Sequence, residues 1–87
     1  MGYLTIKDME TVFRKKFRAS KQYLTTAHAE IGKRRLYALV RAYGYAAEAE
    51  MALDLLPTSA SVSGDKRREW EDNIVHHIYA IEEELGI

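Results

Sequence analysis

The sequence contains no cysteine and only one proline, Pro57. Without cysteine, the chain cannot form a disulfide scaffold, a thiolate-ligated zinc site or a cysteine nucleophile. No apolar run approaches the ~20 residues that a membrane-spanning helix needs, and the N-terminus lacks the basic-then-apolar pattern of a signal peptide. We therefore expect a cytoplasmic protein that does not associate with membranes.

Complete catalytic and metal-binding motifs are also missing. The segment 28–30 (His-Ala-Glu) matches the start of a zinc-deaminase site, but that chemistry requires two further cysteine ligands. The segment 32–34 (Gly-Lys-Arg) matches only the end of a phosphate-binding loop, because Ala27 stands where the motif needs its first glycine. Asp72 and His76 could hold a metal from one side, but two ligands on an exposed helix bind weakly. The sequence therefore predicts a protein that is not an enzyme and that holds no metal or cofactor.

Charge is present in quantity but is unevenly distributed. The formal net charge is zero, yet residues 1–44 carry ten Lys and Arg side chains against three acids, and residues 45–87 carry three against ten. Either the two halves neutralise each other within one fold, or each half attracts a different partner.

The first half of the chain predicts a long amphipathic helix over about residues 6–31, because its apolar residues recur every three or four positions. Thr5 and Asp8 resemble a capping box at its start. Gly32 indicates the break before the next helix, with a bend at residues 25–26 as the alternative. The expected buried stripe consists of Met9, Val12, Phe13, Phe17, Leu24, Ala27 and Ile31.

A second helix, expected over about 33–56, carries two apolar stripes. The stripe that we expect to form the main core contact consists of Leu36, Leu39, Val40, Tyr43, Ala47 and Met51. The stripe beside it consists of Ala42, Ala46, Ala49, Leu53 and Leu56. Two stripes are typical of a central helix that is contacted from two sides. Glu50 and Asp54 extend the first stripe, so we expect the helix to turn to its second stripe near its end, leaving both acids in water; the alternative is a salt bridge to the first helix.

The third helix is expected over about 65–86, after a loop over 57–64 that is rich in small, turn-forming residues. Ser63 or Asp65 can cap its first turn. We place His77 at the edge of its core stripe, with one ring nitrogen hydrogen-bonded. That stripe consists of Trp70, Ile74, Ile78, Ile81 and Leu85.

No segment predicts a strand, and the 87 residues suffice for a single hydrophobic core. We therefore predict a single all-α domain over residues 1–87, folded as a small three-helix antiparallel bundle. The alternative is a long bent helical hairpin that completes its core by dimerisation.

Two basic surfaces are candidate binding sites for a partner or an anionic ligand. Arginine side chains can clamp phosphates, and tyrosine rings can stack on nucleic-acid bases. Acids of the third helix could also neutralise either surface. The first surface consists of Lys7, Arg14, Arg18 and Lys21, and the second, expected to face away from the core, of Arg34, Tyr37, Arg41 and Tyr45.

These features favour a non-catalytic small helical interaction module that regulates or inhibits a larger protein partner through its charged helical faces and that can form homo-oligomers. Tyr and Arg commonly anchor such interfaces. The alternative function is nucleic-acid or nucleotide binding through the basic N-terminal half. The sequence pI near 6.8 weighs against it, because dedicated nucleic-acid domains are usually basic as a whole. Small helical proteins of this size are common among accessory genes of phages and plasmids, although size is not a motif.

Overall fold

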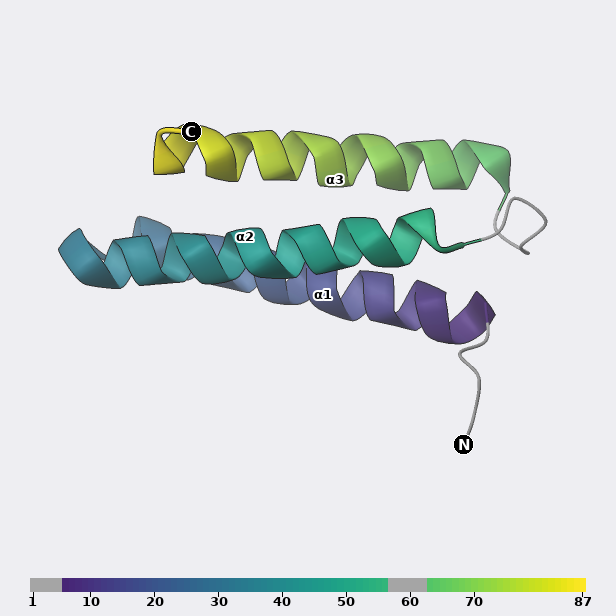
Figure 1. Ribbon diagram of the computed structural model, residues 1–87, viewed down its shortest axis with the longest axis horizontal. Coiled ribbons are helices and arrows are strands. Elements are labelled where there is room, and N and C mark those ends of the chain that lie inside the picture. Colours follow the sequence, from purple (N-terminus) through teal and green to yellow (C-terminus); the bar gives the residue numbers. More distant parts are fainter. Residues whose placement is uncertain (1–5, 57–62) are drawn as a thin grey trace.

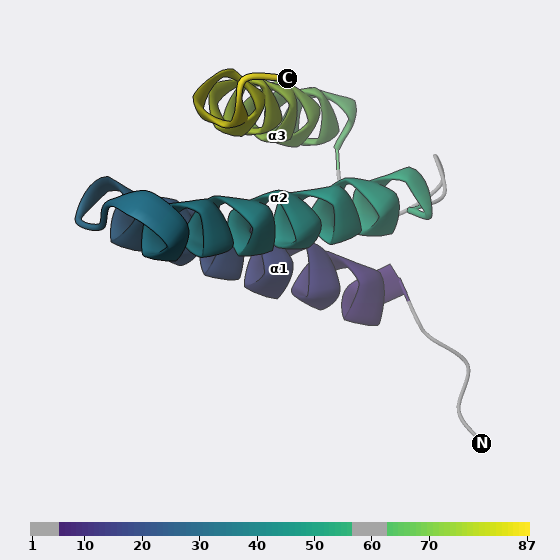
Figure 2. The same cartoon turned by 60° about the vertical axis from the view of Figure 1, so that its left-hand side comes forward.

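The computed structural model describes residues 6–56 and 63–87, and these residues form three α-helices and no strand. The helices are α1 (Ile6–His28), α2 (Gly32–Asp54) and α3 (Gly64–Leu85). Figure 1 shows α2 running antiparallel to both neighbours, and Figure 2 shows it as the middle layer. The predicted three-helix bundle, with a central second helix, is therefore confirmed. Thr5 of the expected capping box, and most of the loop predicted over 57–64, lie outside the described residues.

Local chemistry sets the helix ends. Gly32 has a φ of +62°, a left-handed conformation that favours glycine, so the break between α1 and α2 lies there. The alternative bend is wrong, because Thr25 and Thr26 remain helical and donate their hydroxyl protons to carbonyl groups one turn earlier. At the start of α3, the Ser63 hydroxyl accepts a 3.2 Å hydrogen bond from the Lys66 backbone N–H, as expected of the cap.

The helix α2 buries mainly alanine, together with Leu39 and Leu53, and exposes several of its large apolar residues. The expectation that Leu36, Val40 and Met51 form the main core contact is wrong, because more than half of each side chain is exposed. Ala47 is exposed too. The alanine stripe is buried along the whole helix, because α2 lies between two helices and small side chains let neighbouring backbones approach closely. The buried residues of α2 are Ala38, Leu39, Ala42, Ala46, Ala49, Ala52 and Leu53, so Leu39 of the expected main stripe was correctly assigned to the core.

The two acids near the end of α2 lie outside the core. Asp54 is exposed and Glu50 is half-buried. Neither forms an ion pair with a described residue. The α1–α2 ion pair is instead the one between Lys16 and Glu48, at 2.9 Å.

The outer helices add aromatic and further aliphatic residues to the core. Phe13 of α1 is buried and stacks on Trp70 of α3, with ring centroids 5.2 Å apart. Ile74 and Ile81 are fully buried, which confirms the predicted stripe of α3. Ile31 is wrongly assigned to the core and is 86% exposed, because it follows the end of α1 in an extended conformation.

One buried hydroxyl joins all three helices. Ser20 of α1 is fully buried, and its Oγ lies 2.6 Å from the Ala42 carbonyl oxygen of α2 and 2.7 Å from His77 Nε2 of α3. Because the hydroxyl has one proton and gives it to the carbonyl, His77 Nε2 must be the donor to Ser20. Burial, and to a lesser extent the nearby Lys21, lowers the pKa of His77. The expected edge position of His77, with one bonded nitrogen, is confirmed.

Acids near the end of α3 bind the hairpin formed by α1 and α2. The Glu84 carboxylate lies 2.9 Å from His28 Nε2 and accepts a 2.9 Å hydrogen bond from Arg35. Tyr43 donates its hydroxyl proton to Glu82 at 2.6 Å, and that hydrogen bond is the main cause of the raised pKa of Tyr43. The acidic half of the chain is thus partly neutralised by the start of α2.

Candidate interaction surface

The most conspicuous surface of the molecule is an apolar stripe on α2, which we call the outer face. Its side chains recur every three or four residues, so they share one side of the helix. Single exposed apolar residues are ordinary, but a contiguous exposed apolar patch marks an interaction site. The outer face consists of Leu36 (55% exposed), Val40 (54%), Ala47, Met51 (64%) and Leu55 (66%), the last directly after the helix.

Gly44 lies in the middle of the outer face. A Cβ atom built there would lie more than 4 Å from every atom beyond its chain neighbours and the adjacent backbone of its own helix, so the surface is open at this point. Glycine within a helix is unfavourable relative to alanine. Its position therefore suits the close approach of another backbone better than it suits the isolated helix.

The predicted strip on α2 divides into two parts, and the first part lies at the seam between α1 and α2. Arg41 donates a 3.1 Å hydrogen bond to the Tyr45 hydroxyl. The Tyr45 ring stacks on Tyr23 of α1 with centroids 5.5 Å apart, and Lys16 lies 5.2 Å from its centroid. Arg41 is exposed, as expected of a residue that faces away from the core, whereas Tyr45 is half-buried because its ring stacks on Tyr23 of α1.

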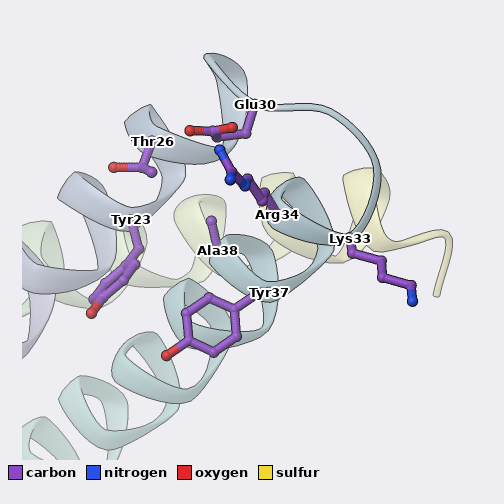
Figure 3. Close-up of a pocket in the computed structure, with 7 residues that line it drawn as sticks. All are labelled: Tyr23, Thr26, Glu30, Lys33, Arg34, Tyr37 and Ala38. Carbon is purple, nitrogen blue, oxygen red and sulfur yellow. The ribbon is translucent and has the colours of Figure 1, made fainter.

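The second part of the strip, Arg34 and Tyr37, lines a cavity of about 320 Å³ between the end of α1 and the start of α2, which we call the tyrosine pocket. In Figure 3 the Tyr23 and Tyr37 rings lie toward one end of the pocket, Glu30 and Arg34 lie toward the other, and Lys33 extends away. The lining residues are Tyr23, Thr26, Glu30, Lys33, Arg34, Tyr37 and Ala38.

The basic surface of α1 faces a groove of about 260 Å³ that it shares with α3. Arg14 lies 5.3 Å from the Trp70 ring centroid, and Lys21 lies 4.5 Å from that of Phe17, as in cation–π contacts. Together with Arg18, these cations form no ion pair with a described acid. The acids of α3 therefore leave this surface positively charged.

Lys7, the remaining predicted residue of this surface, belongs to α1, but its side chain lies outside the described part of the structure. The other three predicted cations share one groove, whereas the predicted residues of α2 lie on a different side of the hairpin. The two predicted surfaces are therefore separate sites.

On α3, the His76 side chain contacts the backbone of its own helix. His76 Nδ1 lies 2.7 Å from the Asp72 backbone carbonyl oxygen. Within the ranges 6–56 and 63–87, His, Asp and Glu side chains form no group of three that could hold a metal ion.

Sequence reasoning assigned most of the outer face to the core and so missed it as a site. The available signals were the neighbouring alanine stripe and Gly44, which together indicate that another side of α2 can meet the bundle. Over the part of the chain that the structure describes, no helix is both long enough and apolar enough to span a membrane. Comparison with protein-family models, curated proteins and solved structures found no match to this chain.

Proposed function

We propose that this protein is a non-catalytic interaction module that binds another protein through the outer face of α2. The exposure of four large apolar side chains on one stripe supports this function. Apolar surface in water is unfavourable by roughly 25 cal/mol per Å², so covering the stripe with a partner would release free energy. A small bundle of this kind can regulate or inhibit a larger protein without chemistry of its own.

The tyrosine pocket supports the same function, because Tyr37 belongs to its lining and follows Leu36 of the outer face. Tyrosine and arginine are enriched among the residues that dominate binding energy. The pocket suits an apolar side chain of a partner, and the neighbouring Lys33 and Arg34 suit an acidic group beside it.

Site-specific photocrosslinking in the native host tests the proposed function. A photoreactive phenylalanine analogue replaces Val40 on the outer face, or Tyr79 in the matched control. Tyr79 is also a large, well-exposed residue, at 63%, but it lies on α3. We expect protein adducts from position 40 and few from position 79. Equal yields at the two positions, or no adduct at position 40, would contradict the proposal.

A second function, nucleic-acid binding, is favoured by the unpaired cations of the α1 groove. Arg14, Arg18 and Lys21 line that groove with Phe17 and Trp70. Cations combined with aromatic rings are typical of surfaces that bind single strands.

For that function, we expect affinity for single-stranded nucleic acid to fall steeply with salt, and the double variant Arg14→Ala/Arg18→Ala to flatten the slope. The single variant Arg68→Ala, which removes an exposed cation of α3, serves as the control. Absence of salt-sensitive binding at low ionic strength would exclude the function.

A further inference from the structure

We infer that the outer face of α2 packs against the same face of a second copy of this chain, with the two α2 helices antiparallel. The inference rests on the proposed function and narrows its partner to an identical chain. The first observation is the charge along α2. Residues 32–43 contain four Lys and Arg side chains and no acid, whereas residues 44–54 contain three acids and no base.

Several of these charges have no partner within the described bundle. Arg35 pairs with Glu84 and Glu48 pairs with Lys16, so both are neutralised internally. In contrast, five charges of α2 form no ion pair with a described residue: Lys33, Arg34, Arg41, Glu50 and Asp54. The unpaired bases lie in the first half of the helix and the unpaired acids in its second half, which is the complementarity that antiparallel self-association requires.

The positions on α2 also match an antiparallel register. A two-fold axis through the midpoint between Tyr43 and Gly44 would place four apolar residues of the face opposite apolar residues of the second copy. The facing pairs would be Lys33 with Asp54, Leu36 with Met51, and Val40 with Ala47. In this arrangement apolar residues contact apolar residues, and a base contacts an acid. Two parallel α2 helices would instead place Lys33 of one chain beside Lys33 of the other.

Small residues lie where the two helices would come closest. Gly44 and Ala47 are near the axis, and the space above Gly44 is open. Interhelical distance depends on the side chains at the contact point, so this centre permits close packing. The larger Leu36 and Met51 lie further out, where antiparallel helices diverge.

The expected interface is modest in size. At ~1.5 Å per residue, the 23 residues of α2 form a helix about 34 Å long, and two such helices in contact bury on the order of 1,000 Å². This area is near the lower limit for specific association, so we expect a reversible dimer with a dissociation constant on the order of micromolar.

Sedimentation equilibrium over a range of concentrations tests the inference, and circular dichroism verifies that each variant is folded. We expect the mass to rise from the 10.0 kDa of one chain to about twice that value. Val40→Glu should weaken association about tenfold or more, because each dimer would bury two carboxylates near the axis. Tyr79→Glu, the matched control on α3, should leave association unchanged. A wild-type chain that stays monomeric, or a dimer that tolerates Val40→Glu, would overturn the inference.

Charge reversal tests the antiparallel orientation. Lys33→Glu alone and Asp54→Lys alone should each weaken the dimer, and the double variant should restore it, because the facing charges are then merely exchanged. Single variants without effect, or a double variant that is weaker than both, would overturn the orientation. A monomeric chain that still crosslinks from position 40 to a different protein would overturn the second copy as partner but preserve the proposed function. A chain that neither dimerises nor crosslinks would remove both.

Discussion

The two sides of α2 reverse the usual distribution of residues. The side that faces α1 and α3 is built largely from alanine, and the outer face is built largely from leucine, valine and methionine. In most surface helices the large apolar residues face the core. The difference teaches that burial is decided by how closely helices can approach, and that the side chains left outside remain available to a partner.

The largest effect on stability should come from enlarging the buried side. Ala46 is fully buried, so Ala46→Leu overfills the seam and should lower the free energy of unfolding by about 1–3 kcal/mol. Urea denaturation at low protein concentration measures this change. The adjacent variant Ala47→Leu is the matched control, because Ala47 is exposed, and we expect it to change stability by less than about 0.5 kcal/mol. Equal losses from both variants would refute the distinction between the two sides.

A smaller effect should follow from removing the hydroxyl at the three-helix junction. Ser20→Ala deletes the hydrogen bonds to the Ala42 carbonyl and to His77, and we expect a loss of about 1 kcal/mol. Thr25→Ala is the control, since that exposed hydroxyl bonds only a carbonyl of its own helix. The same urea titration should show almost no change for Thr25→Ala. A Ser20→Ala chain that is as stable as the wild type would indicate that these hydrogen bonds contribute nothing to the free energy of unfolding.

The junction should also make stability depend on pH. Burial is the main cause of the lowered pKa of His77, followed by the charge of Lys21. The unfolded chain therefore binds a proton at this residue more readily than the folded chain does. The contribution of neutral His77 to stability should be fully present above its pKa in the unfolded chain, about 6.5, and should be lost as the pH falls below that pKa. Urea midpoints on both sides of that pH should shift less in His77→Gln than in the wild type, and an identical pH dependence in the two chains would contradict this cause.

The helices were predictable because their signals are local. The single apolar stripe of α3, from Trp70 to Leu85, has no competing stripe, so periodicity alone identifies its buried side. Gly32 and Ser63 mark helix ends through backbone conformation and capping, which depend only on neighbouring residues. The buried side of α2 was not predictable from hydrophobicity, because two stripes compete and the less hydrophobic one allows closer packing.

The candidate site was predictable only in part, for a related reason. Arg34 and Tyr37 do lie together at a pocket. Arg41 and Tyr45 lie instead at the seam with α1, where the Tyr23 ring contacts both of them. The residue of α1 that faces a given turn of α2 depends on how the two helices align. The sequence pattern of α2 alone does not determine that alignment.

Disulfide trapping between two single-cysteine variants tests most directly whether the outer face is an antiparallel interface between two copies of this chain. The chain has no cysteine of its own, so Leu36→Cys and Met51→Cys each introduce one defined thiol. A disulfide requires Cα atoms within about 7 Å, whereas the antiparallel arrangement places the two copies of position 36 on the order of 20 Å apart along the helices. After mild oxidation we predict a covalent dimer from the mixture of the two variants and almost none from Leu36→Cys alone. Efficient trapping by Leu36→Cys alone, or none in the mixture, would contradict the account.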